Sequence, residues 1–198
     1  EFLGRGKRVG LVPIGCGQIY VWTTFNSPLE SRAWGLESVD TLRRLFAEFT
    51  DARVRQVFAE LGSVDRVLCT DIEEVDPARW VGGRVALLGD AAHALTPNMG
   101  QGAGMAMEDA AVLAEELALA DRGEKSLAAA LDRYVTRRRE RVETIVRLSR
   151  VIGEEGQLTS ALGCWLRNRR LMREGRGVER AQVTLGRLLA WPAEGGER

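Results

Sequence analysis

The chain has 198 residues, 45% of them hydrophobic and 28% charged, an ordinary composition for a globular protein large enough to bury its own core. Its 28 basic and 28 acidic side chains cancel, so no overall field favours nucleic acid or an anionic membrane. No apolar run approaches the roughly 18 residues of a membrane span, and the three well-separated cysteines, Cys16, Cys69 and Cys164, indicate reduced thiols in a cytoplasmic protein.

The first expected element is a β-hairpin. Residues 9–14 and 18–25 are strand-like runs joined by Gly-Cys-Gly, which is a hairpin signal. In the second run Tyr20 and Trp22 alternate with bulky neighbours, so both faces of this strand carry large side chains. Two interpretations stay open: Tyr20 and Trp22 face a small-molecule substrate, or both faces are core or interface.

Two helices and a strand are expected next. Apolar residues recur at helical spacing between residues 38 and 61. Thr50 and Asp51 mark a break between two helices, with Asp51 as the N-cap of the second and Gly62 as its end. Residues 66–75 are typical of a strand, and Asp76 and Pro77 of a turn after it.

The most informative stretch is residues 83–117. A short apolar run at 85–88 predicts a strand that ends at Gly89 and Asp90, and a loop then leads into a glycine-rich helix start at residues 100–104. The free N–H groups of a helix start attract negative charge, and Asp90 is an acceptor suited to sugar or polyol hydroxyls. A plain turn and an ordinary helix entry are the structural alternatives.

The remainder is expected to be helical. A turn at residues 121–123 precedes Ser126, a candidate N-cap, and further amphipathic helices are expected at 162–172 and 178–191. The basic run at 136–141 predicts a solvated helix face rather than a nucleic-acid site, because acidic residues interrupt it and no aromatic side chains interleave with it.

Several other chemistries do not fit this sequence. The chain has one histidine, His93, and no paired cysteines at metal-ligand spacing, so neither a metal ligand nor a catalytic residue is assigned. Neither a Gly-x-Ser-x-Gly elbow nor a phosphate-binding Gly-x-x-x-x-Gly-Lys-Ser/Thr loop is present. The glycines at 100, 102 and 104 have the wrong spacing and position for a first βαβ dinucleotide site.

The same stretch resembles a known family. Residues 83–93, Gly-Arg-Val-Ala-Leu-Leu-Gly-Asp-Ala-Ala-His, resemble the second FAD motif of the FAD-dependent aromatic hydroxylases, the single-component flavoprotein monooxygenases of the p-hydroxybenzoate hydroxylase fold. Residues 97–104, followed by Glu108, Asp109 and Ala110, resemble the loop and helix that complete this motif. More loosely, residues 4–22 resemble the hairpin of the substrate-domain sheet, and residues 134–141 the arginine-rich helix after the FAD segment.

The resemblance implies an oxidoreductase that uses FAD, with NAD(P)H as co-substrate, to hydroxylate a small aromatic or related ring. It implies that Asp90 binds the ribitol hydroxyls, that the helix start faces the flavin pyrimidine edge and that Pro97 lies by the reacting edge. At Gly104 the family often has asparagine, whose side-chain contact a glycine cannot make. The implied cofactor-binding set is Gly89, Asp90, Pro97, Gly100, Gln101, Gly102, Ala103 and Gly104.

The expected fold is therefore an α+β fragment of an FAD/NAD(P)-binding monooxygenase fold. We expect part of the substrate-binding domain at residues 1–75, the second FAD-binding segment at 76–120 and carboxyl-terminal helices at 121–198. The amino-terminal half that grips the ADP part is missing, so we expect this chain alone to bind FAD weakly or not at all and to be inactive. The strand expected at 85–88 would lack its usual sheet neighbours in this chain. We therefore expect one of three arrangements at its orphaned edge: a homo-oligomer, an exchanged element or an exposed edge.

Two alternatives stay open at this point. One is another FAD-dependent oxidoreductase of the same fold, such as a reductase or dehydrogenase. The other is a non-catalytic fragment that serves as an interaction module.

Overall fold

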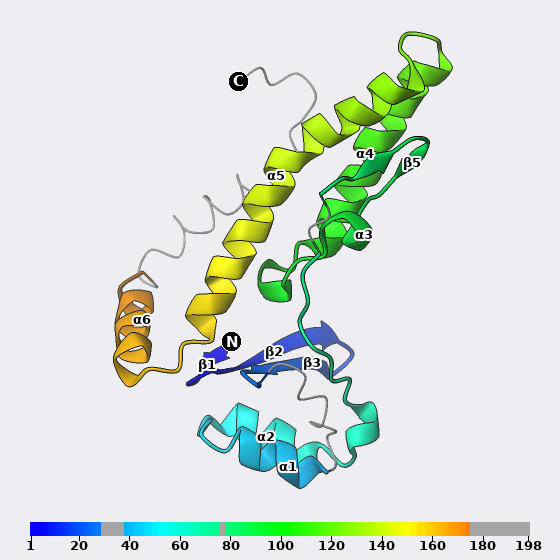
Figure 1. The fold of residues 1–198 in the computed structure, drawn as a ribbon. Coiled ribbons are helices and arrows are strands. Elements are labelled where there is room, and N and C mark those ends of the chain that lie inside the picture. Colours follow the sequence, from blue (N-terminus) through cyan, green and yellow to red (C-terminus); the bar gives the residue numbers. More distant parts are fainter. Residues whose placement is uncertain (29–37, 76–77, 175–198) are drawn as a thin grey trace. The chain divides into compact units, whose positions relative to one another are not determined.

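The computed structural model describes residues 1–28, 38–75 and 78–174, and it divides into two compact units (Figure 1). The first unit comprises Glu1–Asp71 and Glu154–Arg169, and the second is built mainly on Ile72–Gly153. Small antiparallel sheets and longer helices make an α+β architecture. No helix in the described part of the chain combines the length and apolar character needed to cross a membrane.

The first unit contains a three-stranded antiparallel sheet, in the order β1 (Phe2–Leu3), β2 (Lys7–Gly15) and β3 (Gln18–Phe25). Cys16 and Gly17 both adopt positive φ, 50° and 70°, at the tight turn between β2 and β3. This confirms the predicted hairpin, because these small turn residues reverse the chain without splaying the strands.

Two short helices pack on one face of this sheet: α1 (Val39–Leu45) and α2 (Ala52–Glu60). The Asp51 side chain accepts the N–H of Arg53, which confirms Asp51 as the cap of α2, and the helix ends at Glu60, just before Gly62. The core here consists of buried apolar residues from the strands and both helices, namely Val9, Leu42, Phe46, Phe49, Val54 and Phe58.

The register of the hairpin orients Tyr20 and Trp22. Trp22 pairs with Gly10, whereas the buried Val9 beside it faces the helices. A Cβ atom on Gly10 would lie 2.0 Å from Trp22 Cε2, so the indole lies flat across a position that only glycine can fill. The Arg8 guanidinium stacks 5.1 Å from the Trp22 ring. Tyr20 and Trp22 therefore lie on the face opposite the helices, and Tyr20 is exposed.

The strand expected over residues 66–75 is wrong. A 3₁₀ turn, η1 (Val64–Arg66), comes first, and residues 67–75 form no regular element. Leu68 is 89% exposed and Ile72 is 50% exposed. Strand propensity measures how well a side chain fits a half-buried sheet surface, and no described strand pairs with this segment. The turn expected at Asp76 and Pro77 lies outside the described residues.

The second unit opens with a two-stranded antiparallel ribbon of β4 (Val81–Gly82) and β5 (Val85–Ala86). The expected strand at 85–88 is thus shorter, although the N–H of Leu87 still donates to the Trp80 carbonyl at 2.8 Å. Among the described strands only β4 pairs with β5. After this ribbon come α3 (Asp90–His93) and the 3₁₀ turn η2 (Pro97–Met99).

Long helices complete the described chain: α4 (Gly102–Asp121), α5 (Leu127–Gly156) and α6 (Ala161–Glu174). The predicted turn before α5 is confirmed by Gly123 at φ 75°, and Ser126 Oγ accepts the N–H of Ala129 as the expected cap. Helix α6 confirms the expectation for 162–172, while the helix expected at 178–191 lies outside the described residues. In the second unit α4 and α5 run side by side (Figure 1), joined by ion pairs such as Asp109–Arg138.

The core of the second unit gathers around the start of α4. Its buried members come from the segment before β4, from α3 and from the two long helices, and they are Trp80, Ala92, Met105, Val112, Tyr134, Val142 and Ile145. Leu87, Leu95 and Met99 pack against this cluster from the connecting loops. The loops that carry the candidate site residues are therefore anchored by apolar packing on α4 and α5.

Candidate functional site

A glycine in a backbone conformation closed to other residues places the first acidic residue of the site. Gly89 has φ 56° and ψ −140°, a region that essentially only glycine adopts. It is buried, and a Cβ atom added there would lie 3.0 Å from Ala106 Cβ on α4. The chain can therefore turn sharply against α4 at this point, and the next residue, Asp90, starts α3 with its side chain exposed.

The structure brings Asp90 and the glycine-rich helix start together. A Cβ atom on Gly102 would lie 3.9 Å from Asp90 Oδ1, so the missing side chain leaves the carboxylate open beside the helix N-terminus. Gly100 ends η2 in the left-handed conformation at φ 63°, with no atom within 4 Å of its Cβ position. Pro97, Gly100 and Ala103 are exposed.

The N-terminus of α4 offers unsatisfied backbone donors. No side chain of the described residues caps it, although Gln101 stands at the N-cap position, and its first turn carries no acidic residue. The N–H groups at residues 102–104 precede the first intrahelical bond, which Met105 makes to the Gln101 carbonyl at 2.8 Å. This end of a 20-residue helix therefore presents partial positive charge next to Asp90.

The loop before α4 is held on α5 by polar contacts. Ser149 is fully buried, and its hydroxyl donates to the Thr96 carbonyl at 2.6 Å. The Asn98 amide donates to the Ser149 carbonyl at 3.0 Å and lies over Gly153, whose Cβ position is 2.3 Å from Asn98 Nδ2. These contacts fix the turn that carries Pro97.

A buried carboxylate lies behind the site. Asp109 is fully buried on α4 and accepts three hydrogen bonds: from the N–H of Gly89 at 2.9 Å, from His93 Nε2 at 2.5 Å and from Arg138 Nε at 2.8 Å. Burial alone would raise the pKa of Asp109, but the bonds from His93, Arg138 and Gly89 outweigh it and hold that pKa below its usual range. Asp109 is therefore ionised, and a carboxylate that can only accept places a proton on His93 Nε2.

Arg138 corrects the expectation of a fully solvated basic face on α5. It is only 2% exposed and donates to Glu108 at 2.6 Å as well as to Asp109. Arg141, one turn further on, forms a two-bond contact with the same Glu108 at 2.7 Å. Part of the basic run thus joins α5 to α4, because the buried Asp109 and the partly buried Glu108 on α4 need compensating cations.

Tyr134 holds the segment that precedes Asp90, at Leu87. Its ring is fully buried and its hydroxyl donates to the Leu87 carbonyl at 2.9 Å. Burial, and next the negative charge of Asp109, raise the pKa of Tyr134, so the hydroxyl remains a donor at neutral pH. Trp80 packs between these groups, with its ring 5.2 Å from His93 and 6.3 Å from Tyr134.

Four buried polar residues were not among the predicted site residues, although the family resemblance covers their positions: His93, Asp109, Tyr134 and Arg138. One signal was present. The buried positions of α4, which are Met105, Asp109, Val112 and Glu116, recur three or four residues apart, so two of its carboxylates lie on the apolar stripe. A carboxylate at such a position predicts a cation on the neighbouring helix.

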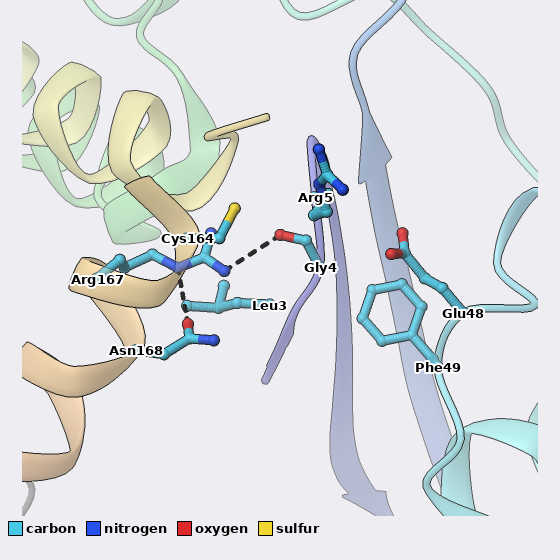
Figure 2. Close-up of a pocket in the computed structure, with 8 residues that line it drawn as sticks. All are labelled: Leu3, Gly4, Arg5, Glu48, Phe49, Cys164, Arg167 and Asn168. Carbon is cyan, nitrogen blue, oxygen red and sulfur yellow. Dashed lines mark hydrogen bonds between the residues drawn. The ribbon is translucent and has the colours of Figure 1, made fainter. Parts of the chain in front are cut away.

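A separate cavity of about 230 Å³ lies in the first unit (Figure 2), and none of the candidate site residues line it. Arg167 projects into it and donates to the carbonyls of Gly4, Glu155 and Gly156. Two of these carbonyls end α5, so the guanidinium satisfies the negative end of that helix. Tyr20 and Trp22 also belong to the first unit, whereas the eight expected cofactor residues belong to the second.

Comparison with known proteins identifies the segment. The FAD binding domain family matches residues 34–149, more than half of the chain. Aurachin C monooxygenase/isomerase from Stigmatella aurantiaca is 43% identical over 87% of this chain and 43% of its own length. The 2-heptyl-3-hydroxy-4(1H)-quinolone synthase of Pseudomonas aeruginosa is 38% identical over 85% of this chain and 43% of its own length.

The fold agrees with these matches. The crystal structure of Klebsiella pneumoniae HpxO complexed with FAD and uric acid is 33% identical, with a TM-score of 0.63, over 89% of this chain and 45% of that one. The chain therefore spans less than half the length of each of these three relatives. The FAD-complexed relative and the matched family agree that FAD is the cofactor. This chain belongs to the FAD binding domain family, among the FAD-dependent aromatic hydroxylases.

Proposed function

We propose that this chain forms the flavin-side, carboxyl-terminal portion of an FAD-dependent monooxygenase that uses NAD(P)H and O₂ to hydroxylate a small aromatic or related ring. The observation that carries the proposal is the placement of Asp90 beside the uncapped N-terminus of α4. In this proposal residues 1–75 contribute to the substrate-binding domain, residues 76–120 form the second FAD segment, and residues 121–198 supply supporting helices.

The donors and acceptors at this face fit the flavin end of FAD. Asp90 is an exposed carboxylate that would accept hydrogen bonds from the ribitol hydroxyls. The N–H groups at residues 102–104 would meet the electron-rich pyrimidine edge of the ring, and Gly100, Gln101 and Ala103 would line the approach. Because glycines at 100 and 102 leave their Cβ positions open, backbone and ligand can come into direct contact.

The flavin, when bound, supplies the reaction with oxygen, and the residues of this chain set its surroundings. The positive end of α4 would stabilise negative charge at the pyrimidine edge by about 0.3–1 kcal/mol, and by more where the site is partly buried. Pro97, fixed by the contacts of its loop to Ser149, would stand by the reacting edge and help to exclude water.

The substrate class rests on the ring compounds named for the relatives. One relative is named for a quinolone product, and another is solved with uric acid. In the first unit the face carrying Tyr20 and Trp22 is turned away from the helices, and its aromatic rings would pack on a planar ring substrate. We include Tyr20 and Trp22 as substrate contacts on this ground.

Turnover by the complete protein tests the proposed reaction. A monooxygenase consumes NAD(P)H and O₂ together and places one oxygen atom from labelled O₂ in the product. Candidate ring substrates, including urate and alkylquinolones, would be screened by oxygen uptake, and the hydroxylated product identified by mass spectrometry. Turnover that proceeds equally well without oxygen would instead assign a dehydrogenase, if the substrate is oxidised, or a reductase, if it is reduced by NAD(P)H.

A further inference from the structure

We propose that Asp109 is a positioning residue, whose buried carboxylate fixes both ends of α3 and thereby sets the place of Asp90 in the flavin site. The inference rests on the proposed function for the role of Asp90, but the positioning itself is a property of this chain alone. Asp109 is fully buried, so it acts on the exposed face only through the backbone that it holds.

The geometry of α3 is the first step. This helix has four residues, Asp90–His93, and is too short to be stable by itself. Asp109 Oδ2 accepts the N–H of Gly89, the N-cap of α3, and also bonds Nε2 of His93, the last residue of the helix. One carboxylate oxygen from α4 therefore clamps both ends of α3, with Asp90 between them.

Arg138 supplies a positive charge beside the ionised carboxylate of Asp109. Its Nε donates to the second oxygen, Asp109 Oδ1, at 2.8 Å, and it is anchored in turn by Glu108. An asparagine at position 109 would keep the size of the side chain but offer a single acceptor oxygen. Its NH₂ group would face donors on His93, Arg138 or Gly89, so the clamp would open on at least one side.

Glu116 is a matched control on the same helix. It is also buried, at 2% exposed, and it pairs with Lys125 at 2.6 Å and with Arg137 at 3.0 Å. The bonds of these two cations go to Glu115 and Glu116 on α4, not to α3. Glu116→Gln therefore removes a buried, doubly paired carboxylate from α4 without opening the clamp, which separates positioning from a general loss of helix packing.

Amide hydrogen exchange of the apo chain tests the positioning directly. Asp109→Asn is expected to speed exchange at Gly89, Ala92 and His93 by about tenfold or more relative to the core of α5. Glu116→Gln is expected to leave these three amides within about twofold of the unchanged protein. Unchanged protection in Asp109→Asn, or an equal effect in Glu116→Gln, would overturn the proposal.

A measurement on the unchanged protein covers the case in which Asp109→Asn fails to fold. Because the sequence contains a single histidine, a long-range ¹H–¹⁵N spectrum reports His93 alone. The clamp requires a protonated Nε2 whose hydrogen exchanges slowly with solvent. A deprotonated Nε2, or a ring proton that exchanges as freely as in a peptide, would overturn the proposal.

Flavin binding then tests the consequence for Asp90. With riboflavin 5′-phosphate as the probe, Asp109→Asn should raise the dissociation constant by about tenfold, and Glu116→Gln should raise it by no more than about twofold. Equal weakening in both variants would refute the link to Asp90. If the unchanged chain alone binds no flavin, the same comparison is made in the complete protein, where absence of flavin would refute the proposed function, while hydrogen exchange and the His93 spectrum still decide whether Asp109 holds α3.

Discussion

The backbone N–H of Gly89 donates to the carboxylate of Asp109 at 2.9 Å, across twenty residues of sequence and inside the core of the second unit. This bond links the turn that presents Asp90 to the helix whose N-terminus lies beside it. The same carboxylate pairs with Arg138, so the exposed site and the buried ion pairs form one connected structure.

Acid should weaken the fold through Asp109. Its pKa is depressed in the folded protein, so its stabilising contribution is complete above the ordinary aspartate pKa of about 3.9 and is lost as the pH falls through the lower folded value. Asp109→Asn should lower the free energy of unfolding at neutral pH by about 3–5 kcal/mol, because it removes one of the two carboxylates that pair with the buried Arg138 and leaves only Glu108.

The measurement is urea unfolding followed by circular dichroism from pH 7 down to about pH 2. The free energy of unfolding of the variant should be lower at pH 7 and should fall less steeply below about pH 4 than that of the unchanged protein. The reason is that the variant lacks the carboxylate whose lowered pKa makes stability depend on pH in this range. A variant with the same neutral stability and the same acid slope would show that Asp109 contributes nothing to folding.

Tyr134→Phe should loosen the segment before Asp90. The substitution keeps the buried ring but leaves the Leu87 carbonyl without its 2.9 Å donor, at a cost of about 1 kcal/mol. Thermal unfolding provides the comparison. The chain has only two tyrosines, and Tyr20→Phe, at a position 55% exposed, is the matched control and should leave the melting temperature unchanged. Equal melting temperatures for both variants would contradict the role given to Tyr134.

Gly89→Ala should be more damaging than an alanine at an ordinary left-handed glycine. Its backbone angles disfavour any side chain, and the new methyl group would press on Ala106 at 3.0 Å. We expect a loss of about 2–4 kcal/mol from strain and crowding together. Gly123, at φ 75° with open space around its Cβ position, is the control, and Gly123→Ala should cost about 1 kcal/mol. Unfolding in urea compares the two, and equal losses would refute the tight approach of Gly89 to α4.

Asp90→Asn should affect flavin binding without affecting the fold. The side chain is exposed, and replacing its charge should change the free energy of unfolding by less than about 0.5 kcal/mol. Loss of charge-assisted bonds to ribitol hydroxyls should weaken flavin binding by about tenfold or more. Asp121→Asn, at the exposed far end of α4, is the control for charge. Flavin affinity unchanged in Asp90→Asn would remove Asp90 from the site.

The hairpin, the two short helices with their Asp51 cap and the long helix after Ser126 could all be predicted, because alternation, helical spacing and caps are local signals. The strand expected at 66–75 could not be excluded in the same way. Its apolar residues have strand character, but a strand forms only where another strand offers an edge, and that is a property of the tertiary structure.

The exposed half of the candidate site was predictable for a similar reason. Glycines, Pro97 and Asp90 mark backbone turns and a helix start, and each leaves a local trace in the sequence. The buried contacts of Asp109 behind these residues leave no such local trace in the sequence. Arg138 belongs to a run of basic residues that is typical of a solvated surface, and only the packing of α5 on α4 shows which arginine is buried against Asp109.

The central claim is that the segment from Gly89 to Gly104 is the flavin side of an FAD site. The most direct measurement is an NMR titration of the chain with FAD, riboflavin 5′-phosphate and ADP, mapped onto assigned amides. We predict weak binding, with a dissociation constant of about 100 μM or more. FAD and riboflavin 5′-phosphate should shift the amides of Asp90 and residues 100–104, and ADP should not. Shifts caused by ADP, or flavin shifts confined to other parts of the chain, would contradict the claim.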